Sequence, residues 1–286
     1  MVVMVATAIE ERRSGRRTFG SQLIRFRDDL VGTRARVEAL CHAERTDRLR
    51  AAPDLADLVR RAELRTIDLW ARGRSAPDFL SLRLGLGTAH VQFPIELEPG
   101  GDDDLRAEAL AALAGVETIH NVPVSVDLCT DAVIGVHGDR DLVDGVVSSL
   151  VIQAATLHSP EDLTIAAAVS SHRPLAWLKW LPHLRSVASP LPGDHLVTTT
   201  AHADALVDRL IEVAAFRSTD GPERVGERRW PRILALLDCQ LTPDPSQVSR
   251  LLDVAHVVGI SVVWLASSAA EVPRPASRVL GVRRTR

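Results

Sequence analysis

The stretch Ala132-Val-Ile-Gly-Val136-His-Gly138-Asp139-Arg140-Asp-Leu-Val-Asp144-Gly145 decides the fold of this 286-residue chain. Its opening residues are apolar, a glycine follows them, and apolar residues then recur at helical spacing. A buried strand that turns through a glycine into a helix is the first half of a strand-helix-strand unit. The stretch therefore predicts a strand over 132–136 and a helix over 142–157.

The alternation of strand and helix continues toward the C-terminus. Apolar runs predict further strands over 163–169, 196–199, 233–237 and 260–266, separated by predicted helices over 175–181, 201–216 and 247–258. Continuous apolar strands that alternate with helices are typical of a parallel sheet with both faces covered. Residues 120–280 are therefore predicted to form an α/β domain.

The turn between the first strand and its helix is where a phosphate-binding loop would lie. Such a loop has the pattern GxxxxGK[ST], in which backbone N–H groups and a lysine bind the phosphates. Here Gly138 and Gly145 have the wrong spacing, the lysine is missing, and Asp139, Asp141 and Asp144 bring negative charge that Arg140 offsets only in part. Gly138, Asp139, Arg140 and Gly145 are predicted to form a degenerate nucleotide site.

A second part of such a site would be an acid at the end of a neighbouring strand. Ile233–Leu237 are apolar and Asp238 follows them, as in a strand whose aspartate reaches Mg²⁺. The next residue is Cys239 and not the glutamate that would activate water. Asp238 completes the candidate site, with the alternative that it only caps a loop. No cofactor is assigned; weak binding of ATP with Mg²⁺, without turnover, is left open.

The N-terminal part has a different pattern. Leu23, Phe26, Leu30, Val37 and Leu40 follow a heptad spacing with Thr33 in the missing place, and Pro53-Asp54 ends that helix and starts another that runs to about Trp70. The pattern predicts a helical hairpin, or stalk, within 1–75. Alternating residues from Leu80 to Leu86 predict a strand in a small linking segment, 76–119, and 281–286 are expected to be a tail.

Two groups of residues are candidates for contacts with partners. Trp177 and Trp180 are three residues apart in a chain with 3% aromatic residues, which indicates either core anchors or a docking surface. An arginine cluster, Arg12, Arg13, Arg16 and Arg17, follows a short apolar stub. This pattern indicates either an ordinary frayed terminus or the cytoplasmic end of a membrane segment.

Composition excludes several classes of function. The net charge of −3 and the absence of tyrosine weigh against a nucleic-acid partner. The three cysteines, Cys41, Cys129 and Cys239, form no CxxC pair, which argues against a metal site or a disulfide framework. No apolar run reaches the ~18 residues that span a bilayer.

Several segments together resemble one family. Leu69–Gly87, Leu150–Leu163, Trp177–His183 and Ile260–Leu265 are similar, in this order, to segments of the EccC ATPases of type VII (ESX) secretion, which belong to the FtsK/SpoIIIE group. The resemblance runs from about residue 12 to 280. Among the catalytic residues of such ATPases, only Asp238 matches, as the strand-end aspartate.

The resemblance implies an actinobacteria-like, membrane-associated secretion protein. It implies that this chain corresponds to a stalk and a degenerate P-loop-NTPase-like α/β domain, placed between membrane helices and true FtsK-type ATPase domains. The expected location is cytoplasmic, at the inner face of the plasma membrane, with membrane contact only through the basic N-terminus or through partners. The implied partners are other type VII secretion subunits and FtsK-type ATPase domains; a homo-oligomer is left open.

The functional prediction is a non-catalytic structural and regulatory part of a secretion ATPase. The alternatives are a free-standing or split ATPase with a divergent site around Gly138–Gly145 and Asp238, and a fragment of a DNA translocase. Charge and aromatic content count against the last. The chain could also be a truncated product, a fragment, or one half of a split protein.

Overall fold

A computed structural model describes residues 3–5, 16–97, 100, 102–219, 230–241 and 244–284, and the side chains of 3–5 and 16–19 are not described. The chain divides into two compact units, each of two sequence segments: Met1–Ala52 with Gly85–Val124, and Pro53–Leu84 with Ser125–Arg286. Among the described residues, no helix is long and apolar enough to cross a membrane. The division into 1–75, 76–119, 120–280 and 281–286 stays a prediction about functional domains.

The first unit is built on one long helix. Helix α1 (Arg16–Ala51) packs on α3 (Asp103–Ala112), and β1 (Val3–Val5) pairs in parallel with β3 (Ile95–Leu97). The predicted heptad seam is confirmed at its centre, where Leu30, Thr33 and Val37 are buried. They lie in a small core with residues of α3 and the turn after it, Ala109, Leu113 and Val116.

Both helices of the predicted hairpin form, α1 in the first unit and the second helix in the second unit, but the second helix ends at Leu64 and not near Trp70. Helix α2 (Leu55–Leu64) begins after Asp54, whose carboxylate accepts a hydrogen bond from Asp57 N at 2.9 Å, so the predicted cap is confirmed. Within the second unit, α2 buries Leu58 fully and packs on α4.

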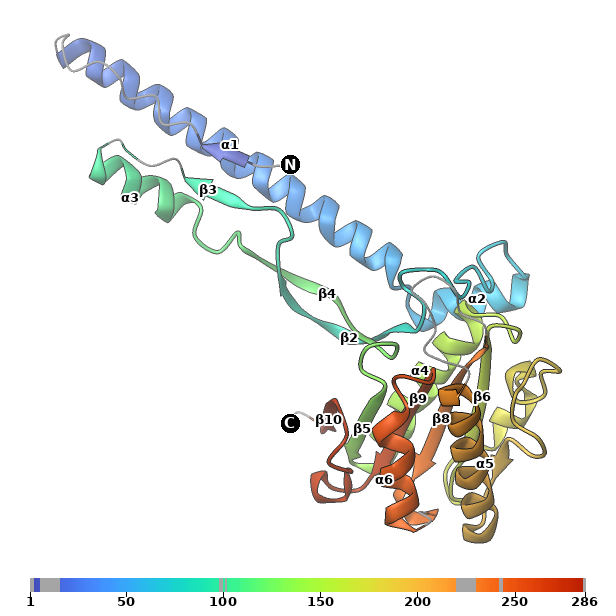
Figure 1. Ribbon diagram of the computed structural model, residues 1–286. Coiled ribbons are helices and arrows are strands. Elements are labelled where there is room, and N and C mark those ends of the chain that lie inside the picture. Colours follow the sequence, from blue (N-terminus) through green and yellow to red (C-terminus); the bar gives the residue numbers. More distant parts are fainter. Residues whose placement is uncertain are drawn as a thin grey trace. The chain divides into compact units, whose positions relative to one another are not determined.

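The second unit contains a six-stranded sheet in which every neighbouring pair is parallel, in the order β10-β5-β9-β8-β6-β7 (Figure 1). This confirms the predicted α/β class. The strands are β5 (Val133–Gly138), β6 (Leu163–Ala168), β7 (Leu196–Val197), β8 (Arg232–Asp238), β9 (Ile260–Ala266) and β10 (Arg278–Val282).

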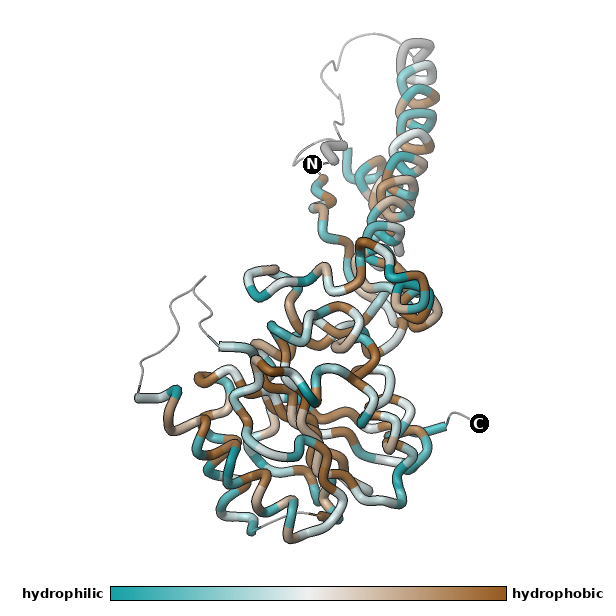
Figure 2. Tube along the Cα trace, turned by 90° about the vertical axis from the view of Figure 1, so that its right-hand side faces the viewer, coloured by the Kyte–Doolittle hydropathy of each residue, from teal (hydrophilic) through white to brown (hydrophobic). Residues whose placement is uncertain are grey.

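Helices cover both faces of this sheet. Alternate strand residues point to opposite faces, so Leu234 and Leu236 of β8 join the core under α4 (Arg140–Leu157), while Ile233, Ala235 and Leu237 join the core under α5 and α6. Helix α5 spans Thr200–Thr219 and α6 spans Pro245–Val254. In Figure 2 the strands form an apolar centre between more polar helices.

Three further elements differ from the sequence prediction. Strand β4 (Thr118–Asp127), which pairs with β2 (Ser81–His90), was not predicted. Gly281 and Val282, expected in a tail, instead belong to β10. The tryptophan segment is a 3₁₀-helix over Ala176–Trp180 and not an α-helix, because Pro182 follows at once and prevents a longer one.

A buried histidine holds the start of β2 to the end of α4. His158 Nε2 accepts a hydrogen bond from Leu80 N at 3.0 Å, and its Nδ1 lies 2.9 Å from the Ala154 carbonyl oxygen. A carbonyl oxygen can only accept, so the ring is neutral with its proton on Nδ1. Burial, together with smaller contributions from its surroundings, lowers the pKa of His158 to about 4.

This neutral histidine predicts a loss of stability in mild acid. In the unfolded chain His158 takes up a proton near pH 6.5, whereas in the folded chain it does so only near pH 4. The contribution of the neutral His158 to the free energy of unfolding is therefore fully present above pH 6.5. It falls by about 3 kcal/mol as the pH drops from 6.5 to 4. Urea unfolding across this range should show a smaller loss for His158→Gln, which does not titrate. Parallel profiles for the two proteins would disprove the role of His158.

Candidate functional site

The candidate site lies at the carboxyl edge of the parallel sheet. The ends of β5 and β8 meet this edge with one strand, β9, between them. Ligands of open α/β sheets bind at this edge, where the connections from neighbouring strands lead in opposite directions. The structure thus brings the predicted β5–α4 turn and Asp238 to the same edge.

The turn from β5 into α4 is very short. Strand β5 ends at Gly138 and α4 begins at Arg140, so only Asp139 lies between them, and Gly145 is inside the helix. A phosphate-binding loop has several residues between strand and helix, whose backbone N–H groups surround the phosphate. The β5–α4 connection does not have that length. Helix α4 starts at Arg140, two residues before the predicted start at 142, so the connection is shorter than the apolar pattern indicated.

Gly138 is required by packing of the strands. Its φ is +134°, and a Cβ atom at this position would lie 2.0 Å from the Val282 carbonyl oxygen of β10. A backbone atom cannot move away as the end of a side chain can. The glycine therefore serves the close approach of β10 to β5, whose register pairs Val282 with Gly138.

Asp238 is held by an arginine that sequence reasoning missed. Arg173, in the segment after β6, donates from Nε to Asp238 Oδ2 at 2.6 Å and from Nη2 to Oδ1 at 3.2 Å. Backbone N–H groups of Ser170 and Gln240 also donate to this carboxylate, at 3.1 and 3.3 Å. The Asp238 side chain is fully buried, and among the described residues four N–H groups donate to its two oxygens.

The same guanidinium also binds a carboxylate of α4. Arg173 Nη1 donates to Asp144 Oδ1, and both side chains are almost completely buried. Burial lowers the pKa of Arg173, but the hydrogen bonds that it donates to Asp238 and Asp144 outweigh the effect of burial, so the net pKa is raised and the group stays charged. We call Asp144, Arg173 and Asp238 the buried ion triad.

The other charges of the predicted site point to solvent. Asp139, Arg140 and Asp141 are exposed, and Asp139 makes no side-chain bond to the helix that follows it. Only one of the three carboxylates expected near the phosphate position, Asp144, is thus buried and paired. Among the described residues, no cluster of side chains could hold a metal ion.

Comparison with known proteins gives a consistent set of relatives. The chain is 35% identical over 229 residues to the ESX-4 secretion system protein EccC4 of Mycobacterium tuberculosis, which covers 68% of this chain and 18% of that protein. It is 28% identical over 204 residues to the ESX secretion system protein EccC of Geobacillus thermodenitrificans, covering 68% and 14%. The chain is homologous to part of the EccC and EssC type VII secretion ATPases. No family model matches it.

Solved structures of EccC and EssC proteins are also similar, at greater distance. EssC (ATPases 2 and 3) from Geobacillus thermodenitrificans is 14% identical with a TM-score of 0.48, over 74% of this chain and 37% of that one. EccC (ATPases 2 and 3) from Thermomonospora curvata, in complex with a signal sequence peptide, is 21% identical with a TM-score of 0.43, over 55% and 32%.

Within this EccC-like chain, a thiol follows the strand-end aspartate. Cys239 Sγ lies 3.4 Å from Glu271 Oε2, which also accepts from Ser267 N at 2.8 Å. Burial, then the neighbouring carboxylate of Glu271, raises the pKa of Cys239 to about 11, so the thiol stays protonated. A protonated thiol is no general base for water.

The partner-contact candidates are found in different surroundings. Trp177 is half-buried and packs against the core, whereas the Trp180 side chain is 74% exposed. Trp177 therefore lies in the core position that one interpretation expected, and a docking role for the exposed Trp180 stays a prediction. Arg12 and Arg13 lie outside the described residues, and for Arg16 and Arg17 only the backbone, at the start of α1, is described.

Proposed function

We propose that this chain is a non-catalytic structural and regulatory part of an EccC-like type VII secretion ATPase, which links membrane components to motor domains during protein export. Its homology supports the family, although it spans less than a fifth of the curated relatives it matches. The observation that carries the proposal is the buried ion triad, in which Arg173 donates hydrogen bonds to both oxygens of Asp238.

Two physical reasons make this site unsuited to magnesium and a triphosphate. A metal at Asp238 would have to displace a bidentate arginine and leave a guanidinium buried beside a divalent cation. The short β5–α4 connection offers few backbone N–H groups to phosphate, and Asp139 and Asp141 repel it. Both reasons favour weak nucleotide binding, if any, and no turnover.

The proposed partners are other type VII secretion subunits and FtsK-type ATPase domains, and the proposed location is the inner face of the plasma membrane. Contact with the membrane would come through the basic N-terminus or through partners, and nucleic acid is not a proposed ligand. Domains 1–75 and 76–119 would form the stalk and its link, and 120–280 the part that docks on neighbours. A homo-oligomer is compatible with this arrangement.

Co-purification tests the structural role. The tagged chain should retain FtsK-type ATPase domains from the same secretion system through a salt wash, and Trp180→Ala should reduce this retention, because an exposed tryptophan is a favoured interface centre. Val187→Ala, which changes another exposed apolar residue of the same unit, is the matched control. A folded chain that retains neither motor domains nor other secretion subunits would contradict the proposal.

A further inference from the structure

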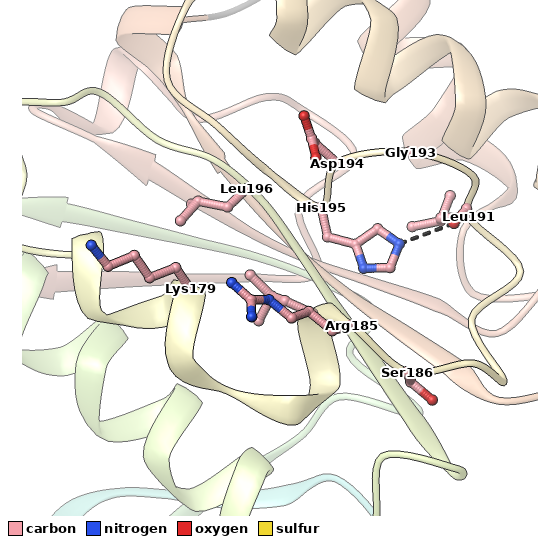
Figure 3. Close-up of a pocket in the computed structure, with 9 residues that line it drawn as sticks. Lys179, Arg185, Ser186, Leu191, Gly193, Asp194, His195 and Leu196 are labelled. Atoms are coloured by element: carbon pink, nitrogen blue, oxygen red, sulfur yellow. Dashed lines mark hydrogen bonds between the residues drawn. The ribbon is translucent and has the colours of Figure 1, made fainter.

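The two edge strands of the six-stranded sheet differ in how well they are protected. β7, at one edge, consists of Leu196–Val197 alone, and Pro192 lies shortly before it. In Figure 3, Leu196 is flanked by the segment that carries Lys179 and Arg185. Short edge strands, prolines and neighbouring segments are means by which natural sheets prevent a further strand from pairing. The β7 edge is therefore protected.

The opposite edge, formed by β10, is open. β10 is five residues long, contains no proline, and is the outermost strand of the sheet in Figure 1. Arg278, Val279 and Gly281 are exposed, and Val279 retains 51% of its accessible surface. Every second residue of an edge strand directs its N–H and C=O groups away from the sheet. Among the described residues, only β5 pairs with β10, so these outward groups are available to another strand.

A groove of about 290 Å³ lies at the carboxyl end of β10, and all of its lining residues belong to the second unit. Its apolar lining consists of Leu84 of β2, Leu142 and Val146 of α4, and Val282 of β10. Val282 and Leu280 pack toward the core under α4. Neighbouring strands lie about 4.8 Å apart, so a strand added to β10 would place a side chain beside Val282 and within reach of the groove.

The charges around this edge indicate the chemistry of such a strand. Arg283 and Arg284 follow β10 directly, are exposed, and form no salt bridge within the described part of the chain. Arg278, at the other end of β10, is already paired with Asp131 at 3.0 Å. Asp141 is exposed in the lining of the groove and would repel a carboxylate there. The groove therefore favours an apolar side chain, and the residues after β10 favour an acidic one.

We propose that β10 accepts an extended strand of a partner protein, which places one apolar side chain in the groove and acidic residues beside Arg283 and Arg284. Backbone hydrogen bonds would supply affinity and the groove would supply specificity, as in other cases of strand addition. A second copy of β10 does not fit this description, because Arg278–Arg286 contain no acidic residue. The surface is also separate from Trp180, whose neighbour Lys179 lies beside the opposite edge of the sheet.

Peptides selected from a phage-displayed random library on the purified chain serve as the probe. The enriched peptides should combine strand-forming residues, one large apolar residue and an acidic end. Gly145→Leu should weaken their binding about tenfold, because Gly145 lines the groove and a side chain there extends into open space. Leucine is favoured inside a helix, so this variant should fold. Gly32→Leu, at an exposed glycine of α1 with equally open surroundings, is the matched control and should keep binding.

Two further measurements test the backbone pairing and the charge. On binding of a selected peptide, hydrogen exchange should slow at alternate amides of β10, because only every second N–H group points to the free edge. The double variant Arg283→Ser, Arg284→Ser should weaken binding about fivefold at low salt, and binding to this variant should depend less on salt concentration.

The proposal is overturned if no peptide is enriched, if the peptides bind Gly145→Leu as tightly as the original chain, or if the amides of β10 gain no protection. Binding that the double arginine variant leaves unchanged would contradict the acidic partner. Sedimentation of the free chain tests the other occupant: a dimer that Gly145→Leu disrupts would assign the edge to a second copy and likewise overturn the proposal.

Discussion

Arg173→Met is expected to lower the free energy of unfolding by about 3–5 kcal/mol. The substitution keeps much of the side-chain volume but leaves Asp144 and Asp238 buried and close to each other without their shared cation. Two uncompensated carboxylates in a nonpolar surrounding are among the most costly defects in a folded protein. Urea or thermal unfolding of the two proteins at neutral pH measures the difference.

Two further variants separate charge from packing in this experiment. Arg140→Met changes an exposed arginine at the start of α4 and should alter stability by less than about 0.5 kcal/mol. The triple variant Asp144→Asn, Arg173→Met, Asp238→Asn removes all three charges and should recover part of the lost stability, because no charge then stays buried. An Arg173→Met protein within about 1 kcal/mol of the original would show that the triad is not formed in solution.

The two glycines of the predicted nucleotide site should respond in opposite directions to alanine. Gly138→Ala places a Cβ atom against the Val282 carbonyl oxygen and forces a positive φ on alanine, so we expect a loss of about 2–4 kcal/mol and detachment of β10 from β5. Hydrogen exchange of the β10 amides would show the detachment directly, as loss of protection confined to that strand.

Gly145→Ala is the matched control. Gly145 lies inside α4, and a Cβ atom there would meet nothing within 4 Å. Alanine is favoured over glycine inside a helix, so this variant should gain about 0.5–1 kcal/mol. Equal losses in the free energy of unfolding from both substitutions would contradict the short connection between β5 and α4. They would instead support a loop through Gly138–Gly145.

The sheet could be predicted from the sequence because its strands are buried on both faces. Continuous apolar runs such as Ile260–Ala266 leave little alternative to a covered parallel sheet. β10 escaped prediction because it is an edge strand with exposed Arg278 and Val279, so its pattern is not apolar. β4 escaped because Asn121 and Pro123 interrupt it with residues that disfavour strands.

The candidate site was predictable in its position but not in its contacts. A strand-end aspartate and a glycine turn can be read from local patterns, and the parallel topology brings both to one edge. Arg173 lies 65 residues before Asp238 and 29 after Asp144, in a segment with no recognisable motif. Only the fold brings the three together, so no pattern of neighbouring residues could indicate that a guanidinium belongs there.

ATP turnover by the purified chain tests most directly whether Arg173 replaces a metal at Asp238. Phosphate release is followed with millimolar ATP and Mg²⁺, and compared with the rate without Mg²⁺ and with Asp238→Ala. A closed ion triad predicts no phosphate release above the protein-free background in any of these samples. Turnover that requires Mg²⁺ and disappears in Asp238→Ala would mean that the aspartate binds metal and that the chain is an ATPase in its own right.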